Sequence, residues 1–413
     1  MNEEIITAVD IGSSKIFALS GILRETGLEV VGAEVLYPSE EVVKNGRVVD
    51  IEGLSNYLYE AFESLKRQTG SRIEWVLLGI GGGHIKGRLL QKMIKIEPNG
   101  RRLDDSDLQN LEREIRTDAV GENESGRKLL HLLSQEYIVD GQSITKKTPI
   151  GLHGNTLEAK VHLLTGSVNP IQDLVQCVRN AGAEVEKIFP HAWAVAEATL
   201  NEEERKLGSL VIDFGKGTTD VALYIDNMLV LTESFWLGGG NIDTDISLLL
   251  HTPLNFAEDL KKNYGWCNYE SLLEEKNPSL YEQVEIFTPT GKLTKQATVE
   301  KISKIVYERV REILEDFIKL TIQKNSYLPA LGGGIVIAGG SSRLKGLVKF
   351  AEEIFGQPAR IGMPKKILGL DKNLLKPAFS AGIGLLLLAG QKETRPKNLP
   401  WWKKIREKAS NWI

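Results

Sequence analysis

The pattern of apolar and polar residues from Leu210 to Tyr224 predicts a β-hairpin with an unusual turn. A short apolar run ends at Asp213, and apolar alternation resumes at Val221. The turn holds residues that allow tight bends or donate hydrogen bonds: Gly215, Lys216, Gly217, Thr218 and Thr219. Glycines let backbone N–H groups approach an anion closely. Because a carboxylate repels phosphate unless a divalent cation lies between them, we predict a magnesium–phosphate hairpin, with an ordinary glycine-rich hairpin as the alternative.

A similar pattern occurs near the N-terminus and predicts a second phosphate hairpin. An apolar strand leads into Asp10, and the turn that follows contains Gly12, Ser13, Ser14 and Lys15. Two such hairpins, one in each half of the chain, suggest two related domains that face one nucleotide. A third motif is a buried strand that ends at a glycine pair, where a purine or ribose could lie against the backbone. Its residues are Gly339, Gly340, Ser341 and Arg343.

These three motifs, in this order, resemble the two phosphate loops and the adenosine loop of the actin-like ATPase superfamily. The resemblance implies an α/β fold of two domains, each with a mixed sheet and helices, around an interdomain cleft that binds ATP and magnesium. Asp10 and Asp213 would hold the Mg²⁺ through water, and the other motif residues would hold the nucleotide. Glu258 and Lys261 lie three positions apart on a predicted helix, where the resemblance assigns them to ribose and adenine. A solvated ion pair is the alternative.

Composition agrees with a globular protein of more than one core. The chain has 413 residues, 42% hydrophobic and 26% charged, and a net charge of −4 that gives no reason to expect nucleic-acid binding. Cys177 and Cys267 stand alone, which favours a reducing compartment without disulfides. The N-terminus is acidic and does not have the pattern of a signal peptide. The longest apolar run, Gly382 to Gly390, is too short to span a membrane and predicts a buried helix.

Periodicity also predicts the elements around the motifs in the first half of the chain. Gly53 to Arg67 has the apolar spacing of an amphipathic helix, and Trp75 to Ile80 is a buried strand. The three glycines after it, Gly81 to Gly83, are interpreted as a hinge into an insertion from His84 to Gly166. Within the insertion we expect a helix capped by Asp104 or Ser106 and two strands, 129–140 and 157–165. No metal-ligand spacing such as HExxH connects its histidines, so we expect surface or core roles for His84, His131, His153 and His162.

The second half is predicted in the same way. Asn169 and Pro170 are expected to cap and open a helix that ends at Gly182, and Pro190 to open another. Residues 298–324 have the spacing of one long amphipathic helix. The expected division is a first domain of 1–83, 167–192 and 360–390; an inserted α+β subdomain of 84–166; a second-domain core of 193–227 and 298–359; a small subdomain of 228–297; a linker of 391–400; and a terminal helix of 401–413.

The insertion narrows the resemblance to one family. Its segments Ser134–Asp140, Pro149–Leu152 and Glu158–Thr165 resemble FtsA, the bacterial actin-like cell-division family. The resemblance implies a filament-forming protein that tethers the C-terminal peptide of FtsZ to the cytoplasmic face of the membrane at the division site and meets later division proteins. It would place the FtsZ contact within 224–297. At the position where the superfamily orients the attacking water with Gln or Glu, this chain has Pro190 and His191, so we expect slow ATP hydrolysis at most. Lys216 also departs from the family, which commonly has Gly there.

The C-terminal segment predicts a membrane-binding helix. After a polar linker, the sequence WWKKIREKASNWI gathers its apolar residues on one helical face and its basic residues on the other. The residues expected to meet an anionic lipid surface are Trp401, Trp402, Lys403, Lys404, Ile405, Arg406, Lys408, Trp412 and Ile413. A terminal helix docked on its own domain is the alternative. Two other functions stay open: a pilus-assembly ATPase scaffold of the same fold, and a small-molecule kinase, for which we find no acidic base.

Overall fold

The structure is a computed structural model that describes residues 5–25, 27–39, 41–98, 100–119, 126–145, 148–288 and 293–390. Its first sheet has five strands in the order β11-β6-β1-β2-β3. The N-terminal hairpin and the third strand pair antiparallel, whereas β6 and β11 run parallel to β1. The strand bounds are β1 Ile5–Ile11, β2 Ile16–Arg24, β3 Gly27–Leu36, β6 Trp75–Ile80 and β11 Glu184–Pro190. A short hairpin, β4 (Val43–Lys44) and β5 (Arg47–Val48), follows β3.

The second sheet repeats this arrangement. Its first five strands have the order β18-β17-β12-β13-β14, with an antiparallel hairpin beside two strands that run parallel to β12. The bounds are β12 Ser209–Phe214, β13 Thr219–Ile225, β14 Met228–Phe235, β17 Gly334–Ala338 and β18 Ala359–Ile361. Both predicted phosphate hairpins therefore occupy the same place in two sheets of the same connectivity, and the prediction of two related domains is confirmed.

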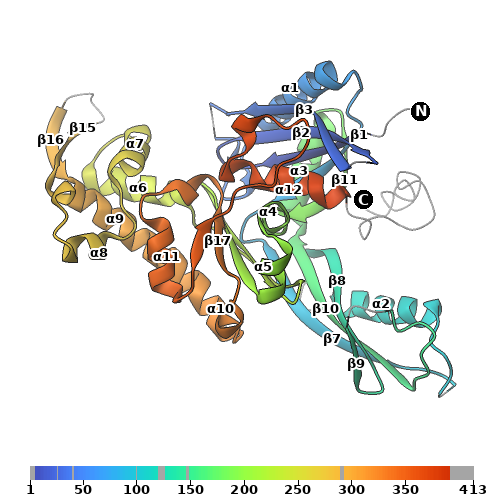
Figure 1. The fold of residues 1–413 in the computed structure, drawn as a ribbon. Coiled ribbons are helices and arrows are strands. Elements are labelled where there is room, and N and C mark those ends of the chain that lie inside the picture. Colours follow the sequence, from blue (N-terminus) through green and yellow to red (C-terminus); the bar gives the residue numbers. More distant parts are fainter. Residues whose placement is uncertain are drawn as a thin grey trace.

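Two buried helices lie between the sheets. The helix α4 (His191–Thr199) packs on β12 and β13, and α12 (Ser380–Gly390) packs on β1, β2 and α4. One continuous apolar core joins them to both sheets. The opposite face of the first sheet is covered by α1 (Ile51–Thr69) and α3 (Val168–Asn180). Since α4 follows directly from β11, its first residues lie where the two domains meet (Figure 1).

The insertion forms a sheet that extends the second one. Its strand β7 (Ile85–Lys95) pairs with β14 through Glu233 and Lys86, and β10 (Thr156–Ser167), β8 (Arg127–Val139) and β9 (Gln142–Thr145) follow outward. The helix α2 (Asp105–Ala119) covers one face, and Asp104 accepts a hydrogen bond of 2.8 Å from the backbone N–H of Ser106, as predicted. His84, His131 and His162 are buried or half-buried and His153 is exposed, which agrees with core and surface roles.

Helices dominate the rest of the second domain (Figure 1). The long predicted helix begins at Val299, and Thr298 caps it by accepting from the N–H of Lys301. It runs as α9 (Val299–Arg311), a π-helix (Glu312–Lys319) and α10 (Leu320–Lys324). The wider π-turn lets Ile313, Leu314 and Ile318 all be buried. The remaining elements are α5 Glu202–Leu207, α6 Gly239–Leu250, α7 Leu254–Tyr264, α8 Tyr269–Glu274, β15 Gln283–Phe287, β16 Leu293–Thr298 and α11 Leu347–Phe355.

One cap prediction is wrong. The helix α3 begins at Val168, so Asn169 lies within its first turn and does not cap it. The reason is that β10 continues to Ser167 and the chain passes from strand to helix without a loop. Pro170 still suits its place, because the first N–H groups of a helix have no partner within the helix.

Candidate functional site

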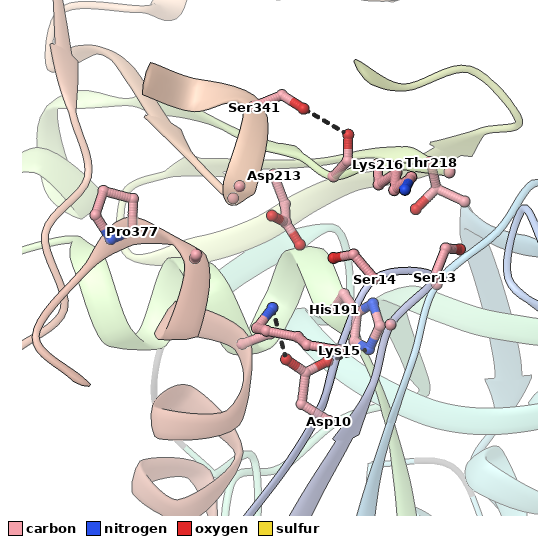
Figure 2. A pocket seen from close by; sticks show the side chains of 18 of the residues that line it. Asp10, Ser13, Ser14, Lys15, His191, Asp213, Lys216, Thr218, Ser341 and Pro377 are labelled. Atoms are coloured by element: carbon pink, nitrogen blue, oxygen red, sulfur yellow. Dashed lines mark hydrogen bonds and ion pairs between the residues drawn. The ribbon is translucent and has the colours of Figure 1, made fainter. Parts of the chain in front are cut away.

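The cleft between the two phosphate hairpins opens into a cavity of about 730 Å³. Sixteen of the seventeen residues predicted to bind nucleotide line it. They are Asp10, Gly12, Ser13, Ser14, Lys15, Asp213, Gly215, Lys216, Gly217, Thr218, Glu258, Lys261, Gly339, Gly340, Ser341 and Arg343. Residues from both domains and from three separate motifs thus converge on one space (Figure 2).

The two hairpin turns are built alike and face each other. In the first, the N–H of Gly12 donates to the carbonyl of Lys15 at 3.0 Å; in the second, the N–H of Gly215 donates to the carbonyl of Thr218 at 2.9 Å. A Cβ on Gly217 would lie 2.5 Å from Ser13 Oγ and 3.0 Å from the backbone nitrogen of Asn45, so a side chain there would force the opposite turn to move. Glycine at this position therefore lets the two turns approach each other across the cleft.

Thr219 does not belong to this lining, which corrects its assignment. Its side chain is fully buried, and its hydroxyl donates to the carbonyl of Leu237 at 2.8 Å. The reason is the strand itself: β13 begins at Thr219, and successive residues of a strand point to opposite faces. Thr218 faces the cavity, and Thr219 faces away from it.

A cluster of acidic groups lies at the floor of the cavity. Asp10 and Asp213 are both buried, and Lys15 lies 3.8 Å from Asp10 (Figure 2). Burial acts to raise the pKa of Asp10, but Lys15 and His191 outweigh it and lower that pKa. For Asp213, burial and the nearby charge of Asp220 raise the pKa to about 7. The carboxylates outnumber the cations beside them, which is the electrostatic condition that favours a divalent metal ion.

Three residues of this cluster were not predicted as site residues: Asp220, His191 and Gly81. The Asp220 carboxylate accepts from the hydroxyl of Thr218 at 2.8 Å, from the N–H of Gly82 at 3.3 Å and from the hydroxyl of Ser234. His191, at the start of α4, has Nε2 3.1 Å from the Asp10 carboxylate. Burial acts to lower the pKa of His191, but the surrounding carboxylates, Asp10 first, raise it to about 9.

Gly81 was interpreted as part of a hinge, yet it also lines the cavity. The run of three glycines directly after a buried strand was the available signal, since the first-domain motif also follows a strand end. The chain enters the insertion just after these glycines, since β7 begins at Ile85.

The far end of the cavity is formed by the third motif and α7. Gly339 has φ of 84°, and a Cβ on it would lie 2.5 Å from the Asp213 carboxylate, so this position requires glycine. The hydroxyl of Ser341 donates to the carbonyl of Gly215 at 2.9 Å and ties the third motif to the second hairpin.

Lys261 and Glu258 do not form the solvated pair that was the alternative. Lys261 is 6% exposed, and its ammonium lies 2.7 Å from Asp243 and donates to the carbonyl of Gly239 at 3.0 Å. Glu258 instead pairs with Lys262 at 2.6 Å and with Lys216 at 3.6 Å. Lys216 therefore lies at the cavity wall, where its half-exposed ammonium group is close to the Glu258 carboxylate.

A second hollow of about 550 Å³ is lined by residues of α6 and α9. Its lining combines apolar and charged residues: Asp245, Leu249, Lys301, Lys304, Ile305, Glu308, Arg309 and Glu312. Leu248 and Leu249 on α6 are 66% and 59% exposed, which is unusual for two adjacent leucines.

In the part of the chain that the structure describes, no helix is long and apolar enough to cross a membrane. The predicted linker and membrane-binding helix, 391–413, lie outside the described residues.

Comparisons with known proteins agree on one family. A family model described as cell division protein FtsA matches residues 210–384, and a model of the SHS2 domain inserted in FtsA matches residues 82–165. The chain is 33% identical to a cell division protein FtsA of Pseudomonas aeruginosa, over 95% of this chain and 90% of that protein. It is 31% identical to one of Borreliella burgdorferi, over 99% of this chain and 96% of that protein.

Solved structures identify the fold. A PilM–PilN type IV pilus biogenesis complex matches with a TM-score of 0.63 and 15% identity, over 94% of this chain and 98% of the other. MreB5 of Spiroplasma citri bound to ADP matches with a TM-score of 0.53 and 15% identity, over 93% and 95%. At this identity the likeness concerns the fold alone. The chain has the predicted actin-like ATPase fold of two domains, with an inserted subdomain.

Proposed function

The chain belongs to the FtsA family of cell division proteins, and we propose that it is an ATP-binding, polymerising actin homologue that anchors FtsZ to the cytoplasmic face of the membrane at the division site. It would also help to recruit later division proteins. The observation that carries the proposal is the cavity of about 730 Å³, lined by both glycine-rich hairpins and the third motif. Three segments far apart in the sequence meet there with the donors that a nucleotide requires.

ATP would lie with its phosphates between the two hairpin turns and its adenosine against the third motif. The hydroxyls of Ser13 and Ser14 and the backbone N–H groups inside the two turns would donate to phosphate oxygens. The N–H groups of Gly12 and Gly215 and the hydroxyl of Thr218 hold the turns and Asp220 in place. Gly339 and Gly340 leave room for the sugar and base, and Lys261 and Glu258 border the same end. Lys216 would add a positive charge beside the phosphates.

The buried carboxylates fit a magnesium ion between them and the phosphates. Asp10 and Asp213 would hold it, and the raised pKa of Asp213, caused by burial and by Asp220, supports a missing positive charge at this point. The ion would neutralise phosphate charge when bound. Lys15, 3.8 Å from Asp10, would share that task.

Hydrolysis would be slow because of the residue at the start of α4. A general base must accept a proton from water, but His191 lies between carboxylates with its pKa raised to about 9, so it is a cation at neutral pH. Asp220 already accepts three hydrogen bonds. The site therefore suits a nucleotide-dependent switch.

The hollow on α6 and α9 is the best place for the C-terminal peptide of FtsZ. It lies at the edge of the 224–297 region, and a short peptide could place apolar side chains against Leu249 and Ile305. Lys301, Lys304 and Arg309 would meet acidic groups of the peptide, whereas Glu308 and Glu312 would meet basic ones.

Membrane attachment would come from 401–413 through the linker 391–400, and it rests on the sequence. A single amphipathic helix of 13 residues binds a membrane weakly, because its ordering opposes the gain from apolar insertion. A filament presents many such helices at once, so attachment should depend on polymerisation as well as on lipid charge.

Vesicle co-sedimentation tests this proposal. The full chain should sediment with anionic vesicles in the presence of Mg²⁺ and ATP, and should bring a soluble FtsZ C-terminal peptide with it. Lys301→Glu with Lys304→Glu should lose the peptide but keep the vesicles, whereas deletion of 401–413 should lose the vesicles but keep the peptide. Sedimentation of the deleted chain at the level of the full chain would refute membrane anchoring.

A further inference from the structure

The first turn of α6 is in direct contact with the nucleotide cavity. The N–H of Gly239 donates to the carbonyl of Gly215 at 2.9 Å, and the N–H of Gly240 donates to the carbonyl of Lys216 at 2.8 Å. A Cβ on Gly239 would overlap the hydroxyl oxygen of Ser341, which belongs to the third motif. The start of α6 is therefore held between the second phosphate hairpin and the adenosine end of the cavity.

The next turn of α6 adds a buried ion pair to this contact. Asp243 lies four residues after Gly239 and so on the same face of the helix. Its carboxylate is 2.7 Å from the ammonium group of Lys261, which lines the cavity. Both side chains are buried, and a buried charge is costly when it loses its partner. A movement of Lys261 on nucleotide binding would therefore be transmitted to α6.

The other side of α6 lines the second hollow. Asp245 is two residues beyond Asp243, or about 200° further round the helix, and Leu249 follows one turn later on the same side as Asp245. Asp245 and Leu249 both line the hollow. The Asp245 carboxylate accepts two hydrogen bonds from the guanidinium group of Arg309 on α9, at 2.7 and 3.0 Å. Such a two-bond pair fixes Arg309 relative to α6, so the position of α6 sets the shape and charge of the hollow.

The helix α6 is built to move as one body. Its third side is buried in the core of the second domain through Ile242, Ile246 and Leu250, and it packs against α7 and α9 (Figure 1). Close-packed helices shift as rigid elements, because a packed core does not deform continuously. Asp243 and Asp245 are only about 3 Å apart along the helix axis. Less than one turn of helix thus separates the residue that holds Lys261 from the residue that holds Arg309.

We propose that α6 couples the two sites, so that Mg–ATP in the cleft tightens the binding of a short peptide in the second hollow. The inference rests on the proposed function, since it takes ATP as the ligand of the cleft and the peptide as the occupant of the hollow. Bound nucleotide would hold the second hairpin and the third motif at a fixed separation, and α6 lies between them. A peptide that meets Asp245 and Arg309 already in place loses less conformational entropy on binding.

The coupling must act in both directions. If Mg–ATP raises the affinity for the peptide, the peptide raises the affinity for Mg–ATP by the same factor. Couplings between two sites of one protein are typically about 5- to 150-fold, and we expect about tenfold here.

Hydrogen–deuterium exchange on the full chain tests the coupling without any peptide. Mg–ATP should slow exchange of the backbone N–H groups from 245 to 250, compared with the nucleotide-free chain in EDTA. These groups lie beyond the turn that contacts the cleft, so their protection reports on the helix as a whole. Two chain concentrations separate the effect from polymerisation, because protection by filament contacts would rise with concentration and protection through α6 would not.

Asn241→Ala is designed to loosen α6 from the cleft. The Asn241 side chain accepts a hydrogen bond of 2.9 Å from the N–H of Gly238 and so closes the first turn, yet Asn241 lines neither the cavity nor the hollow. We expect this variant to bind ATP but to lose the ATP-dependent protection of 245–250. Thr244→Ala is the matched control on the next turn, since Thr244 is exposed and lines neither space, and it should keep the protection.

Fluorescence anisotropy of a labelled, soluble FtsZ C-terminal peptide, without vesicles, measures the same coupling at the hollow. Mg–ATP should raise the peptide affinity about tenfold in the wild type and in Thr244→Ala, and should change it little in Asn241→Ala. Calorimetry on the same samples shows whether ATP is bound. A peptide that binds neither with nor without ATP, while 245–250 is still protected by ATP, would refute the assignment of the peptide but support the coupling through α6.

The coupling would be overturned if ATP binds and the exchange of 245–250 stays the same. It would also be overturned if the peptide binds with equal affinity in the presence and absence of Mg–ATP, or if Asn241→Ala keeps the full effect. Absence of ATP binding would instead refute the proposed function, and the coupling with it. If Asn241→Ala does not fold, judged by urea unfolding, the two wild-type comparisons decide.

Discussion

In the absence of metal ions, replacing Asp213 with Asn should stabilise the folded protein. The same change should abolish Mg²⁺-dependent ATP binding. In the folded chain, burial and Asp220 raise the pKa of Asp213 from 3.8 to about 7. Each pH unit between these values corresponds to about 1.4 kcal/mol of difference between the two protonation states. Above pH 7 the ionised carboxylate therefore costs the folded state up to about 4 kcal/mol, a figure that already includes the favourable charge of His191.

The sign of the pH dependence follows from the raised pKa. Below pH 4 the carboxyl group is protonated in both the folded and the unfolded chain, so Asn and Asp should differ little. As pH rises through 7, the wild type loses the stability of the protonated form, whereas Asp213→Asn does not. The difference in unfolding free energy should therefore grow from pH 4 to pH 8.

Urea unfolding in EDTA at pH 5 and pH 8 measures this difference. Asp107→Asn is a matched control with the opposite sign, because Asp107 is 3% exposed and receives two hydrogen bonds of 2.7 and 2.6 Å from Arg101, which lower its pKa. Replacing Asp107 with Asn should therefore lower the free energy of unfolding at pH 8. A destabilised Asp213→Asn at pH 8 in EDTA would refute the electrostatic account of the cleft floor.

Three further predictions concern the adenosine end, turnover and the membrane. Lys261→Met should lower the unfolding free energy by about 3 kcal/mol, because it leaves buried Asp243 unpaired. Lys262→Met, at the exposed neighbour, should change it by less than about 0.5 kcal/mol. Equal effects of the two changes in urea unfolding would contradict the buried pair of Lys261 and Asp243. Steady-state phosphate release should stay far below the roughly 10 s⁻¹ of a typical enzyme, and a rate of that order would show that a base was overlooked. Trp402→Glu should release the protein from anionic vesicles without changing ATP affinity, whereas Glu407→Gln should not; sedimentation unchanged by Trp402→Glu would argue against the apolar face as the membrane contact.

The parts of the site that are formed by residues close together in the sequence could be predicted. A phosphate hairpin needs a strand, a carboxylate and glycines within a few residues, so the motifs at Asp10 and Asp213 are visible in the chain. Thr219 shows the limit of such reading. The motif alone does not tell which of two adjacent threonines faces the ligand, because that depends on where β13 begins.

The parts of the site that depend on topology could not be predicted. His191, Asp220 and Gly81 come from α4, β13 and the end of β6, and only the packing of both domains brings them within reach of one another. The strand β7 was missed for a different reason. It has one face under α2 and one largely exposed, so its polar alternation lacks the long apolar run that indicated the other strands.

Calorimetric titration with ATP tests the central claim most directly. In Mg²⁺ the full chain should bind one ATP per molecule, and in EDTA the affinity should fall at least tenfold, on the order of the 1.4 kcal/mol that the ion contributes. Asp213→Asn should bind ATP equally weakly in both buffers, and Asp226→Asn, at the exposed turn between β13 and β14, should behave as the wild type. A folded Asp213→Asn that binds Mg–ATP as tightly as the wild type would contradict the assignment of the cleft.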